Sequence, residues 1–294
     1  MVLFLFMTIE TIDITSYPMK EVLPILLQDR SAHQNIIWAT DGDKSQITPE
    51  LFTGENSVIL QPRISKTLDE QRKRTRKKAE VMTPVWLCNK MNNFADEQWF
   101  GRKDVFNHEN EDNTWTVTDG PVEFGDGLSW EAYIDSRRLE ITCGEAPYLV
   151  SRYDTTTGEM ISFTSHRIGL LDRKLRVVNE NTSTKSEWME WAERAVQSCY
   201  GYEYQGDNLL IARINVMLTF RDYFVERWNA EPEIELLKRI AYIISWNLWQ
   251  MDGLKDTVPL SESVLCKIFD WRANKSMYFK DCKKEVNSYE PKVI

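Results

Sequence analysis

The second half of the chain alternates stretches of helix length with short apolar runs that are typical of strands. From about residue 131 onward the helix-length stretches cover residues 185–199, 206–224 and 233–246, and a strand-like run precedes or follows each of them. This alternation predicts a sheet with helices on its faces, because parallel strands are usually connected through a helix. The sequence therefore predicts an α/β fold.

The first part of the chain has a different pattern. Residues 8–70 mix short apolar runs with polar turns, and a run of cations follows at residues 72–78. A chain of 294 residues with 42% hydrophobic content can bury one large core, with or without a smaller appendage. We therefore expect a small α+β extension over residues 1–78 and a larger domain over residues 79–294.

Cysteine usage and hydropathy indicate where such a chain works. Its five cysteines are widely spaced, form no CxxC pair and accompany only three histidines, so we expect reduced thiols and no metal site. The apolar run Val2–Phe6 is too short for a signal sequence or a membrane span. The sequence predicts a soluble, cytoplasmic protein with no membrane partner.

One segment, Arg138–Leu149, has the pattern of a strand that leads into a cofactor loop. It consists of a short apolar run, the acidic Glu140 and a turn of small residues that includes Thr142 and Gly144. In doubly wound folds the loop after the first strand lies where a nucleoside cofactor crosses the sheet edge. The single glycine excludes the dinucleotide GxGxxG fingerprint, and a tight structural turn is the alternative interpretation.

Two later carboxylates stand at the ends of strand-like runs. Glu203 follows Tyr200-Gly201-Tyr202, and a carboxylate there can accept hydrogen bonds from both hydroxyls of a ribose. Asp252 ends a longer apolar run and could accept a hydrogen bond from the exocyclic amine of an adenine. An acidic residue in an ordinary turn is the alternative for each.

The order of these motifs resembles that of the gamma-type adenine-N6 DNA methyltransferases, which include the M subunits of restriction-modification systems. The stretch Glu80–Pro84 resembles the Thr-Pro element with which they begin. Glu140–Leu149 is similar to their DPACGSGxFL motif, with glutamate for the acid. Tyr200–Glu203 and Met251–Leu254 resemble the next two motifs. The resemblance covers about residues 80 to 255.

The resemblance implies a Rossmann-like core that binds S-adenosylmethionine and acts on double-stranded DNA. Thr83 and Pro84 would then lie near the methionine end of the cofactor. Glu203 would bind the ribose, and Asp252 the adenine. The residues to which it assigns cofactor binding are Thr83, Pro84, Glu140, Thr142, Gly144, Glu203 and Asp252.

The chain departs from that family at the catalytic motif. Such enzymes orient the acceptor amine with an Asn-Pro-Pro-Tyr motif, which this chain lacks. The nearest candidate catalytic residue is Asn274, where Lys275 and Ser276 stand in place of the prolines. Few residues follow Asn274, so earlier segments, among them residues 8–70, or a partner chain would have to complete the sheet.

The cationic run is the candidate contact with nucleic acid. A net charge of -9 excludes a protein that is basic all over, so any contact with phosphates must be local. A solvated helix face and a phosphate-binding patch are both compatible with the pattern. The candidate residues are Arg72, Lys73, Arg74, Arg76, Lys77 and Lys78.

Two functions remain open at this point. The first is a DNA adenine-N6 methyltransferase, or a methyltransferase subunit, of a restriction-modification system. The second is a non-catalytic cofactor-binding or DNA-binding subunit of a restriction or defence assembly, which the missing prolines favour. A second subunit that supplies base recognition is compatible with either. The recognition sequence, the acceptor atom and the oligomeric state are not determined by the sequence.

Overall fold

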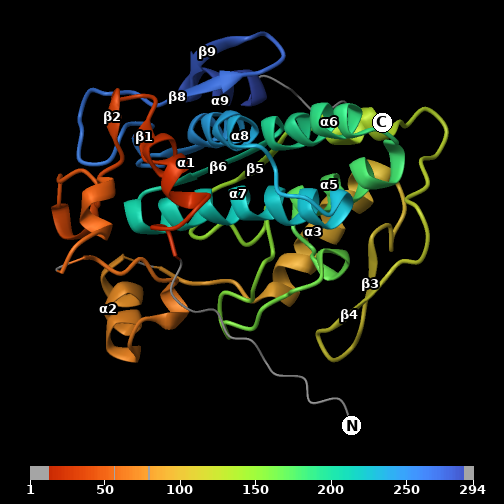
Figure 1. The fold of residues 1–294 in the computed structure, drawn as a ribbon, viewed down its shortest axis with the longest axis horizontal. Helices are drawn as coiled ribbons and strands as arrows, with labels where there is room; N and C mark the ends of the chain where they lie inside the picture. The colour runs from red at the N-terminus through yellow and green to blue at the C-terminus, as the bar shows by residue number, and fades with distance from the viewer. Residues whose placement is uncertain (1–12, 56, 79, 288–294) are drawn as a thin grey trace.

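A three-stranded parallel sheet lies at the centre of the computed structural model, which describes residues 13–55, 57–78 and 80–287. Its strands are β5 (Arg138–Glu140), β6 (Cys199–Glu203) and β7 (Leu248–Gln250), in the order β5-β6-β7. Both pairings are parallel, so the three carboxyl ends meet at one edge (Figure 1). Within the described ranges no further strand joins this sheet.

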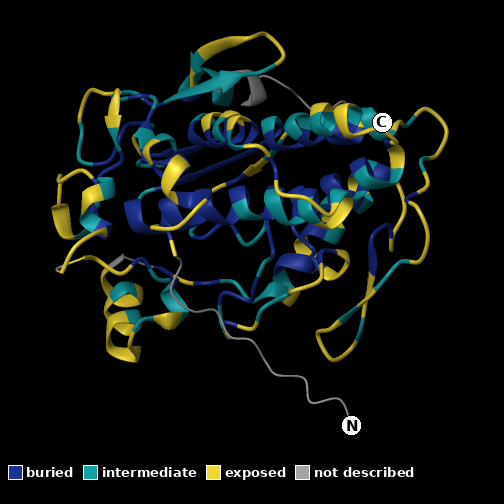
Figure 2. Cartoon of the chain, in the orientation of Figure 1, coloured by how far each residue is buried: buried dark blue, intermediate teal, exposed yellow. Residues whose placement is uncertain are grey.

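Pairs of helices connect the strands. The helices α5 (Leu170–Asn181) and α6 (Lys185–Gln197) lead from β5 to β6, and α7 (Gly206–Trp228) and α8 (Ile234–Asn247) lead from β6 to β7. α7 is buried along most of its length (Figure 2), polar residues such as Asn208, Arg213 and Asn215 included, because it packs between other elements of the core. Asn229 ends α7 in the left-handed conformation that asparagine tolerates.

The elements before the sheet are short. The helices are α1 (Met19–Leu26), α2 (Leu68–Lys78), α3 (Val85–Phe100) and α4 (Trp130–Asp135). Two small antiparallel hairpins pair β1 (Gln28–Asp29) with β2 (Gln34–Asn35), and β3 (Asn107–Glu109) with β4 (Trp115–Val117). β1 and β2, the strands in the described part of residues 8–70, pair only with each other, so this segment adds no strand to the central sheet. Single 3₁₀ turns lie at Thr40–Gly42, Pro49–Phe52, Arg63–Ser65 and Thr164–His166.

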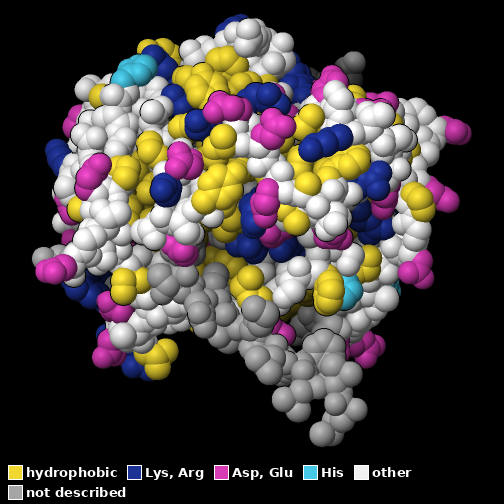
Figure 3. All heavy atoms as spheres, viewed as in Figure 1, with side chains coloured by type: hydrophobic (Ala, Val, Ile, Leu, Met, Phe, Trp, Pro, Cys, Tyr) yellow, Lys and Arg dark blue, Asp and Glu magenta, His cyan; other side chains and the backbone are white. Residues whose placement is uncertain are grey.

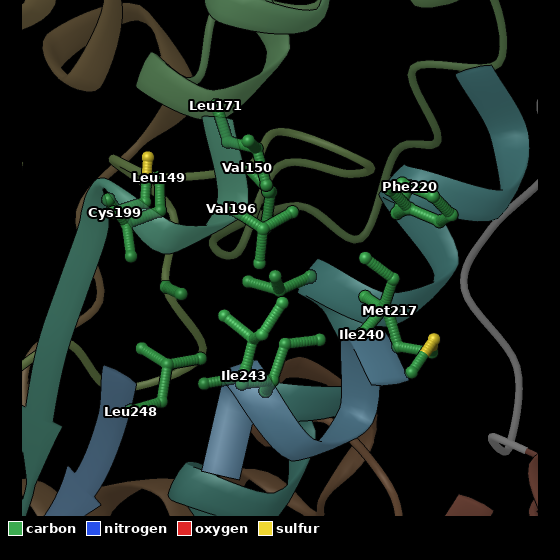
Figure 4. Packing of buried hydrophobic residues seen from close by; sticks show 14 of the residues in the cluster. Leu149, Val150, Leu171, Val196, Cys199, Met217, Phe220, Ile240, Ile243 and Leu248 are labelled. Atoms are coloured by element: carbon green, nitrogen blue, oxygen red, sulfur yellow. The ribbon is translucent and has the colours of Figure 1, made fainter. Parts of the chain in front are cut away.

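The N-terminal segment shares one hydrophobic core with the rest of the chain. Side chains of the loop after β5 and of α5, α6, β6, α7, α8 and β7 point toward one another in this core (Figure 4). Met19, Leu26, Ile36 and Phe52 belong to the same cluster. The composition change near residue 78 therefore does not separate two independently packed units.

A second, smaller cluster covers the opposite face of the sheet. Successive residues of a strand point to opposite faces, so Cys199 lies in the main core while Tyr200 and Tyr202 lie in the second cluster. The hairpin of β8 (Lys267–Asp270) and β9 (Lys275–Tyr278), followed by α9 (Phe279–Asn287), packs over this face at the top of Figure 1.

A buried guanidinium joins α7 to four other elements. The Arg213 side chain has no exposed surface, and its Nε and Nη2 donate to the Leu248 carbonyl at 2.9 and 2.6 Å. Nη1 donates to the carbonyls of Leu26 and Gln28, and Nη2 also to that of Ser245. These carbonyls lie at the end of α1, in β1, near the end of α8 and at the start of β7. Burial lowers the pKa of Arg213 to about 9.

Replacing this side chain should destabilise the fold strongly. We expect Arg213→Met, which keeps the length but removes the donors, to lower the free energy of unfolding by about 3 kcal/mol or more. Arg221→Met is the matched control, because Arg221 lies on the same helix in a partly exposed pair with Glu231 and should cost under about 1 kcal/mol. Urea denaturation measures both. Equal losses in the two variants would show that Arg213 has no special role.

Candidate functional site

The candidate site is the edge at which the three parallel strands end. β5 ends at Glu140, β6 at Glu203 and β7 at Gln250, and Glu203 is the register partner of Gln250. Oε2 of Glu203 accepts a hydrogen bond from the Gly144 N–H at 2.9 Å, and Oε1 accepts one from the Gln205 N–H at 3.0 Å. The structure thus brings Glu140, Gly144 and Glu203 to one edge, as the order of the motifs predicts.

The loop after β5 is held in an unusual backbone conformation. Thr142, Gly144 and Ala146 all have positive φ, at 47°, 53° and 65°. This conformation costs a residue with a Cβ roughly 1–2 kcal/mol. Glu140 supports the loop from beneath, because its Oε2 accepts a hydrogen bond from the Leu149 N–H at 3.1 Å. The motif carboxylates of β5 and β6 therefore hold this loop in place.

Burial changes the ionisation of both carboxylates. Burial raises the pKa of Glu140 to about 8, and the neighbouring Glu203 adds to the rise. Burial also raises the pKa of Glu203, against the effect of the Gln205 and Gly144 N–H groups. Each oxygen that accepts one N–H still has a second lone pair, so Glu203 can accept a further hydrogen bond.

The predicted Thr-Pro element lies beside the same loop. Pro84 precedes the first residue of α3, and the Thr83 carbonyl accepts a hydrogen bond from the Thr155 hydroxyl at 2.9 Å. Met82 is near Gly144: a Cβ added at Gly144 would meet the Met82 sulfur at 3.9 Å, and this is an ordinary contact distance. The backbone at Gly144 can therefore be approached closely, as a cofactor loop requires.

Asp252 lies at this edge but bonds within its own turn. Its Oδ1 accepts hydrogen bonds from the Leu254 N–H at 3.0 Å and the Lys255 N–H at 3.3 Å. Gly253 follows it close to the ring of Tyr202, where an added Cβ would come within 3.0 Å of the ring. These contacts are those of the alternative prediction for Asp252, in which the aspartate stabilises a turn.

Asn274 lies at the opposite edge of the sheet. It occupies the turn between β8 and β9, with φ at 49°. The residue that ends β8, Asp270, accepts a hydrogen bond from Arg137 at 3.0 Å, and Trp271 donates to Asn247 at 2.7 Å. Since Arg137 precedes β5 and Asn247 precedes β7, this turn lies at the amino ends of the strands. The structure therefore does not bring Asn274 to Glu140, Gly144 and Glu203, and its left-handed φ is that of a turn asparagine.

The cationic run divides into exposed and buried members. α2 presents Arg72, Lys73, Arg76 and Lys77 to solvent, whereas the Lys78 side chain lies outside the described residues. Arg74 instead turns inward, with its side chain 12% exposed, and binds Asp207 and Glu80. Arg74 therefore attaches α2 to the rest of the fold rather than facing solvent with its neighbours.

Three charged residues near this edge are not among the site residues that the sequence predicts: Lys66, Glu145 and Asp207. Arg74 Nη1 and Lys66 Nζ both lie 2.8 Å from Asp207 Oδ2, and Asp207 belongs to the first turn of α7. Burial opposes ionisation of Asp207, but Lys66 and Arg74 outweigh it and lower its pKa to about 2. The buried Glu145 accepts hydrogen bonds from the Arg63 N–H and the Tyr153 hydroxyl, both at 2.6 Å. The sequence signal for Asp207 is an acid directly after a glycine that follows the end of a strand, here Gly206 after β6.

Comparison with known proteins gives no match among family models, curated proteins or solved structures. Among the described helices, none is both long and apolar enough to cross a membrane. In the described part of the chain no three histidine, cysteine, aspartate or glutamate side chains form a group that could hold a metal ion.

The strained loop allows a direct stability test. Thr142 is exposed, so Thr142→Gly should relieve the left-handed strain without removing buried contacts and raise the free energy of unfolding by about 0.5–1 kcal/mol. Thr53→Gly is the control, because Thr53 is exposed with φ at -125° and gains nothing from glycine. Urea denaturation of both variants measures the difference. Destabilisation by Thr142→Gly would contradict the strain.

The buried Glu140 should make stability depend on pH. In the folded chain it keeps its proton up to about pH 8, whereas an unfolded glutamate loses it near pH 4.3. Unfolding between these values releases a proton, so the free energy of unfolding should fall as pH rises from 6.0 to 7.5, by about 1–2 kcal/mol. The pKa of Asp172, raised by burial to about 6, lies at the lower limit of this window.

The variant Glu140→Gln removes this titration and should flatten the pH dependence measured by urea denaturation. Glu262→Gln makes the same side-chain substitution at an exposed position and should leave the slope unchanged. An unaltered slope in Glu140→Gln would show that Glu140 does not hold its proton in the folded chain.

Proposed function

We propose that this chain is the S-adenosylmethionine-binding subunit of a DNA adenine-N6 methyltransferase assembly of the restriction-modification kind. The proposal rests on one observation: Glu140, Gly144 and Glu203 gather at the carboxyl edge of adjacent parallel strands. This is where open α/β sheets bind nucleoside cofactors. A Rossmann-like core is part of the same proposal.

Each residue at this edge has a role in the proposed site. The Glu203 carboxylate accepts hydrogen bonds from the ribose hydroxyls with its remaining lone pairs. The loop at Thr142 and Gly144 supplies backbone for close approach, and Thr83 and Pro84 line the methionine end. S-adenosylmethionine carries its methyl group on a sulfonium, so transfer depends chiefly on the positioning of the acceptor amine.

Methyl transfer to adenine also requires a residue that orients the acceptor amine, and the residue predicted for this role does not lie at the carboxyl edge. Asn274 lies at the amino edge, so we propose that a second subunit supplies base recognition and orients the amine. The outer edge of β5 supports this, because within the described residues no strand pairs with it. Leu139 in β5 and Ile141 directly after it are 46% and 63% exposed. Parallel sheets are normally covered on both faces.

A non-catalytic role is the second candidate function. The position of Asn274 also favours a cofactor-binding subunit of a restriction or defence assembly that transfers no methyl group. Radioactive methyl transfer from S-adenosylmethionine to adenine-containing duplex DNA, measured with the assembly that co-purifies with this chain, distinguishes the two, because both predict no transfer by this chain alone. Transfer by this chain alone, lost in Asn274→Ala, would show that the second-subunit part of the proposal is wrong.

Calorimetric titration with S-adenosylmethionine and S-adenosylhomocysteine tests the cofactor site. We expect micromolar binding, about -8 kcal/mol, that falls at least tenfold in Glu203→Ala. Because Glu203 also holds the Gly144 N–H, Asp252→Asn tests the proposed contact of Asp252 with the adenine as a milder change. It removes the charge, keeps the turn acceptor and should weaken binding severalfold. Glu262→Ala is the exposed control. Absence of binding by the folded full chain would rule out the proposed cofactor site.

A further inference from the structure

A cavity of about 260 Å³ opens between α2 and the 3₁₀ turn that begins at Thr40. Four of the residues that line it are cations and two are acids, although the whole chain has a net charge of -9. Acidic and basic side chains are mixed over the face drawn in Figure 3. The lining of this cavity has twice as many cations as acids. The lining residues are Thr40, Asp41, Lys66, Glu70, Lys73, Arg74 and Lys77.

Two of these cations are fixed before any ligand arrives. Lys66 and Arg74 are 13% and 12% exposed, and both bind the buried Asp207 at 2.8 Å. Arg74 also binds Glu80 at 2.7 Å. Cations held in this way lose little conformational freedom when an anion binds, and this lowers the cost of association.

The other two cations are exposed. Lys73 and Lys77 lie one helical turn apart on α2, and within the described residues neither has an ion-pair partner. Like charges at this spacing repel each other and destabilise the helix, so an anion between them would stabilise it. Lysine binds phosphate as a flexible point charge, and this suits a group that closes over a ligand.

One of the other polar side chains of the lining, Thr40, connects the cavity to the candidate cofactor edge. The Glu70 carboxylate accepts hydrogen bonds from the N–H and hydroxyl of Thr67, at 2.9 and 2.7 Å, so it is engaged at the start of α2. The Thr40 hydroxyl donates to Gln205 Oε1 at 2.7 Å, and the Gln205 N–H donates to Glu203. The cavity wall is thus two hydrogen bonds away from Glu203.

We propose that this cavity is a phosphate-binding site, in which Lys66 and Arg74 form the fixed floor and Lys73 and Lys77 close over the anion. The ligand chemistry is a phosphate oxyanion, either an internal phosphodiester of nucleic acid or a free or terminal phosphate. The proposal rests on the proposed function only for nucleic acid as a source of that phosphate. It assigns distinct roles within the cationic run, because Arg72 and Arg76 do not line the cavity.

The test compares two double variants of the full chain that lose the same charge from the same helix. Fluorescence anisotropy measures binding of a labelled duplex DNA across a salt series, and calorimetry measures binding of inorganic pyrophosphate. We expect the double variant Lys73→Gln with Lys77→Gln to weaken the binding of DNA or of pyrophosphate, whichever is the ligand, at least tenfold. For DNA the slope of log K against log salt should also fall by about two. The double variant Arg72→Gln with Arg76→Gln should weaken the binding of either ligand less than about threefold.

The possible outcomes distinguish the two sources of the phosphate and identify the results that would overturn the proposal. Loss of DNA binding in the lysine variant alone supports a phosphodiester ligand, and loss of pyrophosphate binding alone supports a free or terminal phosphate. Equal weakening in the two double variants would mean a diffuse basic helix and would overturn the proposal, as would an intact chain that binds neither ligand. No step uses S-adenosylmethionine, so these results are independent of the calorimetric test of the cofactor site.

Discussion

The fold depends on a buried guanidinium that pairs directly with no carboxylate among the described residues. Arg213 donates to main-chain carbonyls at the ends of α1 and α8 and at the start of β7, and burial of a cation is tolerated only when its donors are satisfied in this way. The same contacts bring the N-terminal segment against α7 and set β7 beside β6. The Gln250 side chain then exchanges two hydrogen bonds with the backbone of Ile37, so the carboxyl edge is partly built from the first forty residues.

The acids at that edge have two roles that pull in opposite directions. Glu140 and Glu203 fix the loop after β5 through backbone N–H groups, yet their burial raises both pKa values and so disfavours the charged forms. Thr142 and Ala146, which have positive φ, add strain to the same loop. Stored strain and buried ionisable groups are typical of functional sites rather than of connecting turns. This combination is the physical reason to regard the edge as a site.

The cations of α2 serve both structure and the proposed ligand contacts. Arg74 is held with Lys66 on Asp207 in the first turn of α7, directly after the strand that carries Glu203. A phosphate bound above these two cations would lie next to the cofactor edge, joined to it through Thr40 and Gln205. A nucleic-acid backbone and a nucleoside cofactor would then occupy neighbouring positions on one side of the sheet.

The sequence by itself determined the features that depend on local pattern. Strand-like runs ending in Glu140 and Glu203, with a small-residue turn at Gly144, could be read directly, and they meet because parallel strands end at one edge. Tertiary structure alone decided the direction of β8, and hence the position of Asn274, because contacts with Arg137 and Asn247 far away in the chain set that direction. It also decided which cation of the run turns inward, since Arg74, unlike its exposed neighbours, faces Asp207 and Glu80. Local periodicity is encoded within a few residues, whereas the partner of a buried charge depends on segments that only folding brings together.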